Sequence, residues 1–248
     1  MAINAKAAVK KAEEAGEGFP GFPRETLKFL KALGFHQTRE WFEENRALYL
    51  SAFKQPMEAY VEALSAACAQ RKLPVKGDAR YSTFRLHRDV RFSKNKQPYK
   101  TNGGCVLTRT GRKGSPGLVY THVSPEGGFL AAGFYHPEPH ELLAVRQAIA
   151  ARPKVFLDLE EKLADVKLSL GDSEQLMRTP SAFRDADERV HHALRMKNFI
   201  VRKPYPEKLL QDGPAMVAAA ADFARDALPL LKWGWKIIDG LPMPKSQG

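Results

Sequence analysis

Apolar side chains recur at helical spacing through the first third of the chain. Leucines in residues 27–33 predict a helix that ends at Gly34, a residue type favoured just beyond helix C-termini. Thr38 is a favoured N-cap for a second helix, and Pro56 suits the first turn of a third. The apolar stripes of these two helices are Trp41, Phe42, Leu48, Tyr49, Ala52 and Phe53, followed by Met57, Tyr60, Val61, Leu64 and Cys68.

The pattern changes to a period of two in the middle of the chain. Residues 81–87 alternate between apolar and polar positions, which predicts a strand. Residues 105–110, 118–123 and 128–135 predict three more strands, separated by segments rich in Gly, Ser and Pro. Because short turns join consecutive strands, we expect an antiparallel meander rather than a parallel βαβ array.

The second half of the chain returns to helical spacing. Pro137-Glu138-Pro139 predicts the start of a helix that continues to Arg152, and Pro153 begins another. A short helix near His191 and a strand at residues 199–201 are expected next. The last long helix is predicted from Gly213 through an Ala-rich run to Pro229.

These elements predict an α+β fold, with an antiparallel sheet of about four or five strands in the middle of the chain. N-terminal and C-terminal helices flank the sheet. We expect a single domain over residues 19–240, preceded by a flexible tail at 1–18 and followed by a tail at 241–248, because no linker interrupts the pattern.

Composition places the chain among soluble globular proteins, with 44% hydrophobic and 27% charged residues. No apolar run approaches the roughly 20 residues that cross a bilayer. We therefore predict a cytoplasmic protein with no membrane partner. Cys68 and Cys105 are far apart in the sequence, which favours two buried, reduced thiols over a disulfide or a zinc site.

Positive charge is concentrated in one segment. The formal net charge is +11 for the chain, and residues 81–116 carry nine Lys and Arg against one Asp. Residues 117–248 hold 17 basic and 17 acidic side chains, so their net charge is zero. This distribution favours a local site for anions over diffuse attraction to polyanions.

The same segment resembles a known signature. The chain has Phe84-Arg85, Arg88-Asp89-Val90-Arg91-Phe92-Ser93, Lys96 and Pro98-Tyr99-Lys100-Thr101-Asn102. These residues are similar to an uncharacterised family of bacterial and fungal proteins, catalogued as a domain of unknown function. The resemblance extends over roughly residues 19–230, through Glu40-Trp41-Phe42, Gly133-Phe134-Tyr135, Pro137, Arg146, Arg178 and Pro180. It implies one α+β domain and no established activity.

Arginine forks suit bidentate contacts with phosphate or carboxylate, and lysines act as mobile point charges. Hydroxyl and amide side chains between these cations add hydrogen-bond donors, and Gly103-Gly104 could leave backbone N–H groups free to form an anion nest. We predict that the segment binds a small phosphate- or carboxylate-bearing ligand. The predicted ligand-binding residues are Arg85, Arg88, Arg91, Ser93, Lys96, Tyr99, Lys100, Thr101 and Asn102.

Further candidates for lining a cleft are Asp89, His122, Tyr135, His136 and Arg178. The spacing of His136, Glu138 and His140 differs from a helical H-E-x-x-H motif, and two prolines intervene, so we predict no metal and no cofactor. No complete set of acid/base or nucleophilic residues can be assembled from the sequence. We therefore predict binding and assign no reaction.

Two alternatives remain open. The basic segment and its aromatic residues could bind nucleic acid without regard to sequence, although no nucleic-acid-binding motif is present. In the other alternative, Arg85, Arg88 and Arg91 surround Asp89 in an internal ion-pair network that fixes the loop and binds no ligand. A concave pocket would favour the small ligand, and a broad exposed stripe would favour a polymer.

Overall fold

The structure is a computed structural model that describes residues 18–91, 96–171 and 174–242. The chain divides into two compact units. The first comprises the described residues of Met1–Ser115, Val119–Ala131 and Lys203–Arg225, and the second those of Pro116–Leu118, Ala132–Arg202 and Asp226–Gly248. The prediction of a single domain stays a prediction, and the predicted tails fall almost entirely outside the described residues.

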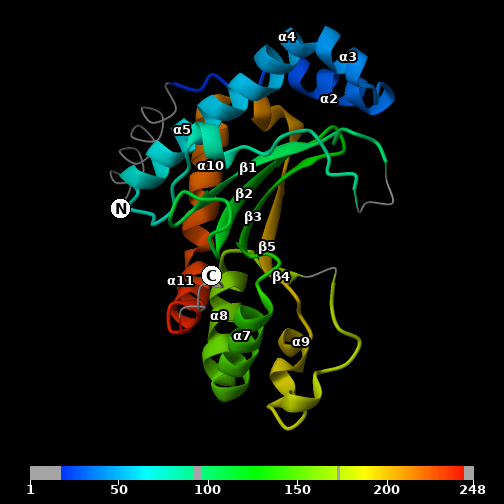
Figure 1. Cartoon of the computed structure of the whole chain (residues 1–248). Coiled ribbons are helices and arrows are strands. Elements are labelled where there is room, and N and C mark those ends of the chain that lie inside the picture. Colours follow the sequence, from blue (N-terminus) through cyan, green and yellow to red (C-terminus); the bar gives the residue numbers. More distant parts are fainter. Residues whose placement is uncertain (1–17, 92–95, 172–173, 243–248) are drawn as a thin grey trace. The chain divides into compact units, whose positions relative to one another are not determined.

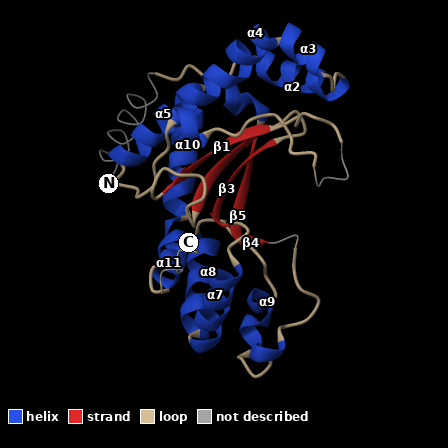
Figure 2. Cartoon of the chain, in the orientation of Figure 1, coloured by secondary structure: helices blue, strands red, loops and turns tan. Residues whose placement is uncertain are grey.

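A single open antiparallel sheet lies in the middle of the chain, with the strand order β1-β2-β3-β5-β4 (Figure 1). The strands are β1 (Gly103–Thr108), β2 (Leu118–Val123), β3 (Gly128–Phe134), β4 (Leu170–Gly171) and β5 (Phe199–Tyr205). The neighbours β1, β2 and β3 form the predicted meander. Helices flank the sheet, which confirms the predicted α+β class (Figure 2).

The first unit contains the described N-terminal helices and two helices from the C-terminal part of the chain. Its helices are α2 (Glu25–Phe35), α3 (Arg39–Glu44), α4 (Arg46–Tyr49), a π-helical segment η1 (Leu50–Lys54), α5 (Gln55–Gln70), α6 (Ala79–Ser82), the 3-10 helix η4 (Glu207–Gln211) and α10 (Gly213–Asp226). Thr38 caps α3 as predicted, since its hydroxyl accepts a hydrogen bond from Trp41 N at 3.2 Å. Pro56 lies in the first turn of α5, also as predicted.

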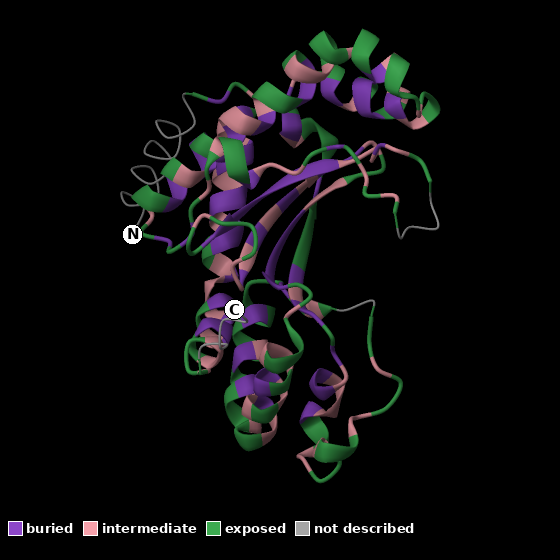
Figure 3. Ribbon diagram, in the orientation of Figure 1, coloured by how far each residue is buried: buried purple, intermediate pink, exposed green. Residues whose placement is uncertain are grey.

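The core of the first unit lies between α5 and the sheet. β1 is buried along all of its residues (Figure 3), and α5 packs against it. The Tyr60 hydroxyl forms a buried hydrogen bond with Thr121 Oγ1 at 3.0 Å. Arg71 at the end of α5 forms an ion pair with Asp222 of α10 at 2.9 Å, which joins the two helices.

Both cysteines are free and buried in this unit, as predicted. Cys68 lies on α5 and Cys105 on β1. Burial raises the pKa of each thiol to about 12. Both groups are therefore protonated at neutral pH and poorly reactive, because the thiolate is the nucleophile.

The second unit contains the remaining helices. They are α7 (Pro139–Ala151), α8 (Pro153–Asp165), the 3-10 helices η2 (Ser181–Phe183) and η3 (Glu188–Val190), α9 (His191–Leu194) and α11 (Leu228–Ile238). Phe156, Phe199 and Trp233 form an aromatic cluster in its core. The predicted starts of α7 and α8 at prolines are confirmed, and Glu138 caps α7 through a capping box with Glu141.

Three sequence predictions are wrong in detail. Gly34 lies inside α2, because the His36 N–H still reaches Ala32 O at 3.1 Å and the helix continues to Phe35. Pro229 does not end the helical region, since it lies in the first turn of a further helix, α11. The strand predicted at 81–87 is replaced by α6 and by an extended segment with isolated bridges.

Among the described residues, no helix combines the length and apolar character needed to cross a bilayer.

Candidate anion-binding cavity

Part of the basic segment folds back on itself, so that residues 84–88 (the first arm) pair with residues 98–104 (the second arm). Three backbone hydrogen bonds join the arms: Arg88 N to Pro98 O (2.7 Å), Lys100 N to Leu86 O (2.7 Å) and Phe84 N to Gly104 O (2.9 Å). The first two hydrogen bonds belong to the pairing of His87 with Tyr99, and the third belongs to the pairing of Thr83 with Cys105. Between these two pairings the second arm contains two more residues than the first, so Thr101 and Asn102 form a bulge. This pairing brings Arg85 of one arm close to Lys100 of the other.

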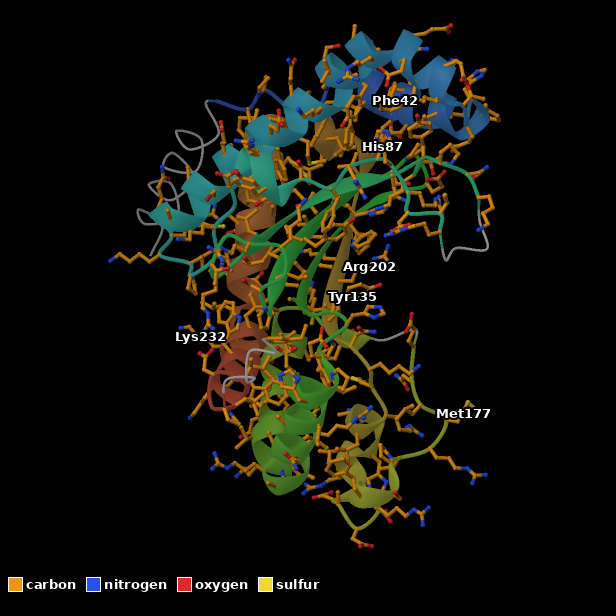
Figure 4. The ribbon with its side chains drawn as sticks, in the orientation of Figure 1. Phe42, His87, Tyr135, Met177, Arg202 and Lys232 are labelled. Carbon is orange, nitrogen blue, oxygen red and sulfur yellow. The ribbon has the colours of Figure 1, made fainter. Side chains whose placement is uncertain are left out.

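Aromatic packing anchors the paired arms to the N-terminal helices. The Tyr99 ring is buried and stacks on Phe42, with centroids 4.6 Å apart and an interplanar angle of 9°. His87 packs edge-on against both rings, and its position beside Phe42 is visible in Figure 4. The backbone N–H of Tyr99 donates to Gln37 Oε1 at 3.0 Å. Tyr99 is thus a packing residue that fixes the backbone position of the neighbouring Lys100.

A cavity of about 420 Å³ lies beside these arms. Its cationic lining residues are Lys54, Arg80, Arg85, Lys100 and Lys113. Its apolar and aromatic lining residues are Tyr49, Phe53, Met57 and Phe84. The run from α4 to α5 therefore supplies Tyr49, Phe53, Lys54 and Met57, and α6 with the basic segment supplies the remaining lining residues.

Most of the cavity's positive charge is not neutralised by the protein. Lys54 lies 3.6 Å from Glu58, whereas Arg80, Arg85, Lys100 and Lys113 form no ion pair with any carboxylate of the described residues. Burial, Lys100 and Arg85 together lower the pKa of the Lys113 amine. Burial is the largest cause, and the charges of Lys100 and Arg85 add to it, so these three cations lie within each other's field.

Lys113 reaches the cavity from the connection between β1 and β2. Its amine donates a hydrogen bond to the carbonyl oxygen of Thr83 and lies 4.8 Å from the centroid of the Phe84 ring. Both contacts favour the charged amine and hold it in place. The lysine therefore joins the β1–β2 connection to the first arm of the basic segment.

The glycine pair has a packing role. Gly103 and Gly104 lie in β1, and neither has a positive φ, so the predicted anion nest is wrong. A Cβ at Gly103 would lie 2.0 Å from Phe53 Cζ, and one at Gly104 would lie 2.3 Å from Thr121 O. The missing side chain at Gly103 allows the Phe53 ring to lie against β1 and form part of the cavity wall.

Among the described residues, the other predicted ligand-binding residues do not line the cavity; they are Arg88, Arg91, Lys96, Tyr99, Thr101 and Asn102. Arg91 forms an exposed ion pair with Asp89 at 2.8 Å and lowers the pKa of that carboxyl group. Arg88 turns to Tyr99 O instead, at 3.5 Å, so Asp89 is paired with one arginine. Lys96 donates to Val90 O at 3.0 Å. Ser93 lies outside the described residues, and the binding roles of all these residues stay predictions.

The candidate cleft residues belong to both units. His122 lies on β2, where its ring stacks on Phe129 at 4.4 Å and its Nδ1 lies 3.1 Å from the Tyr120 hydroxyl. Tyr135, His136 and Arg178 belong to the second unit. The His136 N–H donates to Asn198 Oδ1 at 2.7 Å, and the Tyr135 side chain is exposed. Within the described parts of the chain, no three His, Cys, Asp or Glu side chains are grouped as metal ligands.

Residues 25–233 match the sequence model of a family described as conserved hypothetical protein (DUF2461). The chain belongs to this family. Parallel comparisons with curated proteins and with solved structures found no match. The DUF2461 match covers both the basic segment and the helices that complete the cavity.

Sequence reasoning missed three of the cationic residues in the cavity. Lys113 lies in the basic segment, and its charge contributed to the observed excess, but no spacing connected it with Arg85. Arg80 lies just before that segment and is held by α6. Lys54 carried no recognisable signal, although π-helical turns such as η1 are common at functional sites.

Proposed function

We propose that the cavity binds a small anionic ligand bearing a phosphate or carboxylate group. The observation that carries the proposal is the convergence of four cationic side chains, without a carboxylate partner, on one concave cavity. Like charges held together repel one another, and a bound anion relieves that repulsion. A volume of about 420 Å³ falls within the usual range for small-molecule sites.

The composition of the charged wall also supports an oxyanion. Arg80 and Arg85 offer planar forks for bidentate contacts, and Lys100 and Lys113 offer point charges. The Thr83 carbonyl holds Lys113 near the other cations before any ligand arrives. Such preorganisation lowers the entropy lost on binding.

Thermal denaturation in the presence of phosphate, pyrophosphate and citrate tests the proposal. We expect at least one of these anions to raise the melting temperature of the wild-type chain, because a ligand that binds only the folded state stabilises it. The Arg85→Ala and Lys100→Ala variants should fold and lose most of this stabilisation. Lys154→Ala removes an exposed cation of α8 and is the matched control, expected to respond as the wild type does.

The proposal fails if no anion in a broad phosphate and carboxylate panel stabilises the chain. It also fails if the two cavity variants respond as Lys154→Ala does. Fluorescence anisotropy with single- and double-stranded oligonucleotides at low salt examines the polymer alternative. We expect weak binding, and tight binding that Arg85→Ala abolishes and that falls steeply with salt would replace the small-ligand proposal with a nucleic-acid function.

A further inference from the structure

The two walls of the cavity differ in chemistry. Tyr49, Phe53 and Met57 come from the continuous run of α4, η1 and α5. Phe53 and Met57 are almost completely buried, at 2% and 0% exposure, so their positions are fixed by the core. The Tyr49 and Phe53 rings lie nearly parallel, with an interplanar angle of 20° and centroids 6.2 Å apart. This wall is apolar, aromatic and rigid.

Electrostatic balance differs between the two walls as well. On the aromatic side, Lys54 is paired with Glu58. Burial and the charge of Glu58 raise the pKa of the Tyr49 hydroxyl, which shows that the carboxylate acts at this side of the cavity. On the other side, Lys113 feels the positive charges of Lys100 and Arg85. The cavity therefore changes from a nearly neutral aromatic surface to a strongly positive one.

The charged wall itself contains one aromatic ring. Phe84 lines the cavity between Thr83 and Arg85, and Lys113 lies over its face. Phe84 also contacts Tyr120 of β2 edge-on, with centroids 6.0 Å apart, which holds the ring against the sheet. An oxyanion alone would contact the cations and leave the partly exposed rings of Tyr49 and Phe84 in water. An organic body could bury the exposed part of these rings and gain hydrophobic stabilisation.

We propose that the ligand is an aryl or heteroaryl anion, with its phosphate or carboxylate against Arg85, Lys100 and Lys113 and its flat ring against the partly exposed ring of Tyr49. This inference rests on the proposed anion-binding function. The presence of unpaired cations and a partly exposed aromatic ring on the lining of one cavity of about 420 Å³ carries it, because a flat ring stacks on an aromatic face without requiring hydrogen bonds.

Isothermal titration calorimetry with matched probes tests the inference. Phenyl phosphate and methyl phosphate carry the same dianionic head and differ in the body, and benzoate and acetate form a second pair. We expect each aryl probe to bind at least about tenfold more tightly than its methyl counterpart, as burial of one ring predicts. Equal affinities within each pair would overturn the inference while leaving anion binding intact. Absence of binding by all four probes would overturn the proposed function as well.

Two variants test which residues cause the preference for aryl probes. Tyr49→Leu keeps an apolar side chain and removes the flat ring, so the aryl preference should fall to within about threefold while methyl phosphate affinity is retained. Arg85→Ala should weaken phenyl and methyl phosphate by the same factor. If Tyr49→Leu keeps the full aryl preference, the ring does not lie on Tyr49 and the inference is wrong. The comparison of probes on the wild-type chain stands even if a variant fails to fold.

Discussion

At the scale of single residues, Gly103 determines how closely a helical segment approaches the sheet. A methyl group at this position would overlap the Phe53 ring. We predict that Gly103→Ala lowers the free energy of unfolding by about 1–3 kcal/mol, a typical effect of overpacking. Urea denaturation followed by circular dichroism measures the change.

Gly114 is the matched control for this prediction. A Cβ there meets no atom within 4 Å, so Gly114→Ala should change stability little. Equal stability of the two variants would contradict the packing role of Gly103. Because Phe53 also lines the cavity, Gly103→Ala should in addition weaken the binding of any anion that stabilises the wild-type chain.

The buried hydroxyl of Tyr60 gives a second residue-scale prediction. Tyr60→Phe removes its hydrogen bond with Thr121 and should lower the free energy of unfolding by about 0.5–1.5 kcal/mol. Tyr135 is 61% exposed, so Tyr135→Phe should have a smaller effect. Parallel urea titrations compare the variants, and an equal loss of stability in both would show that the Tyr60 bond contributes nothing net.

At the scale of elements, α6 depends on its N-cap. The Asp78 carboxylate accepts hydrogen bonds from the N–H groups of Arg80 (2.8 Å) and Tyr81 (3.1 Å). Asp78→Ala should destabilise the chain by about 1 kcal/mol, whereas Asp78→Asn keeps a capping oxygen and should cost less. Thermal denaturation of both variants checks this order, and the reverse order would exclude a capping role.

This cap also explains why the prediction of a strand at residues 81–87 is wrong. The period-two pattern placed Leu86 and Arg85 on opposite faces, and in the structure Leu86 is buried and Arg85 is exposed. The pattern contains no information about the Asp78 carboxylate, which stabilises a helical turn at the start of the segment. The bulge at Thr101 and Asn102 was equally invisible, since it depends on pairing between two arms. By contrast, local signals such as Thr38 and Pro153 identified helix starts correctly.

The 3-10 helix η3 has a pH-dependent cap. Hydrogen bonds from the Arg189 side chain and backbone lower the pKa of Asp187 to about 2, from an ordinary value of 3.8. Because the folded-state pKa is lower than the unfolded one, the stabilisation is fully present above about pH 5 and is lost as the pH falls through 4 towards 2.

We therefore predict that Asp187→Asn makes unfolding less sensitive to acid in this range. Stability measured at intervals from pH 5 to pH 2 tests the prediction. Asp185→Asn removes an exposed carboxylate two residues away and is the control. If both variants show the same acid profile as the wild type, the Asp187–Arg189 contact does not contribute to folding.

At the scale of the whole molecule, the cavity shows what a linear pattern can and cannot reveal. Two of the residues predicted from the excess of charge in residues 81–116, Arg85 and Lys100, line a cavity, and their binding role stays a prediction. The apolar stripes of the sequence contain Phe53 and Met57, which are buried in the core, but their position on the cavity lining depends on how η1 packs against β1. Tertiary packing, rather than local propensity, determines this contact between η1 and β1.

The prediction of one domain can be tested through the distribution of two residue types. Both cysteines lie in the first unit, and Trp233 and Trp235 lie in the second. If the chain unfolds cooperatively, thiol labelling and tryptophan fluorescence should show the same urea midpoint in a Trp41→Phe background. Two separated midpoints would divide the chain into two folding domains.

The burial of Cys68 and Cys105 has a kinetic consequence. With pKa values near 12 and almost no exposure, neither thiol reacts until the core around it opens. The rate of alkylation in the absence of denaturant therefore reports how often this part of the core opens, on a timescale of minutes to hours. Since the chain has only these two cysteines, the wild-type protein carries its own opening probe and needs no engineered label.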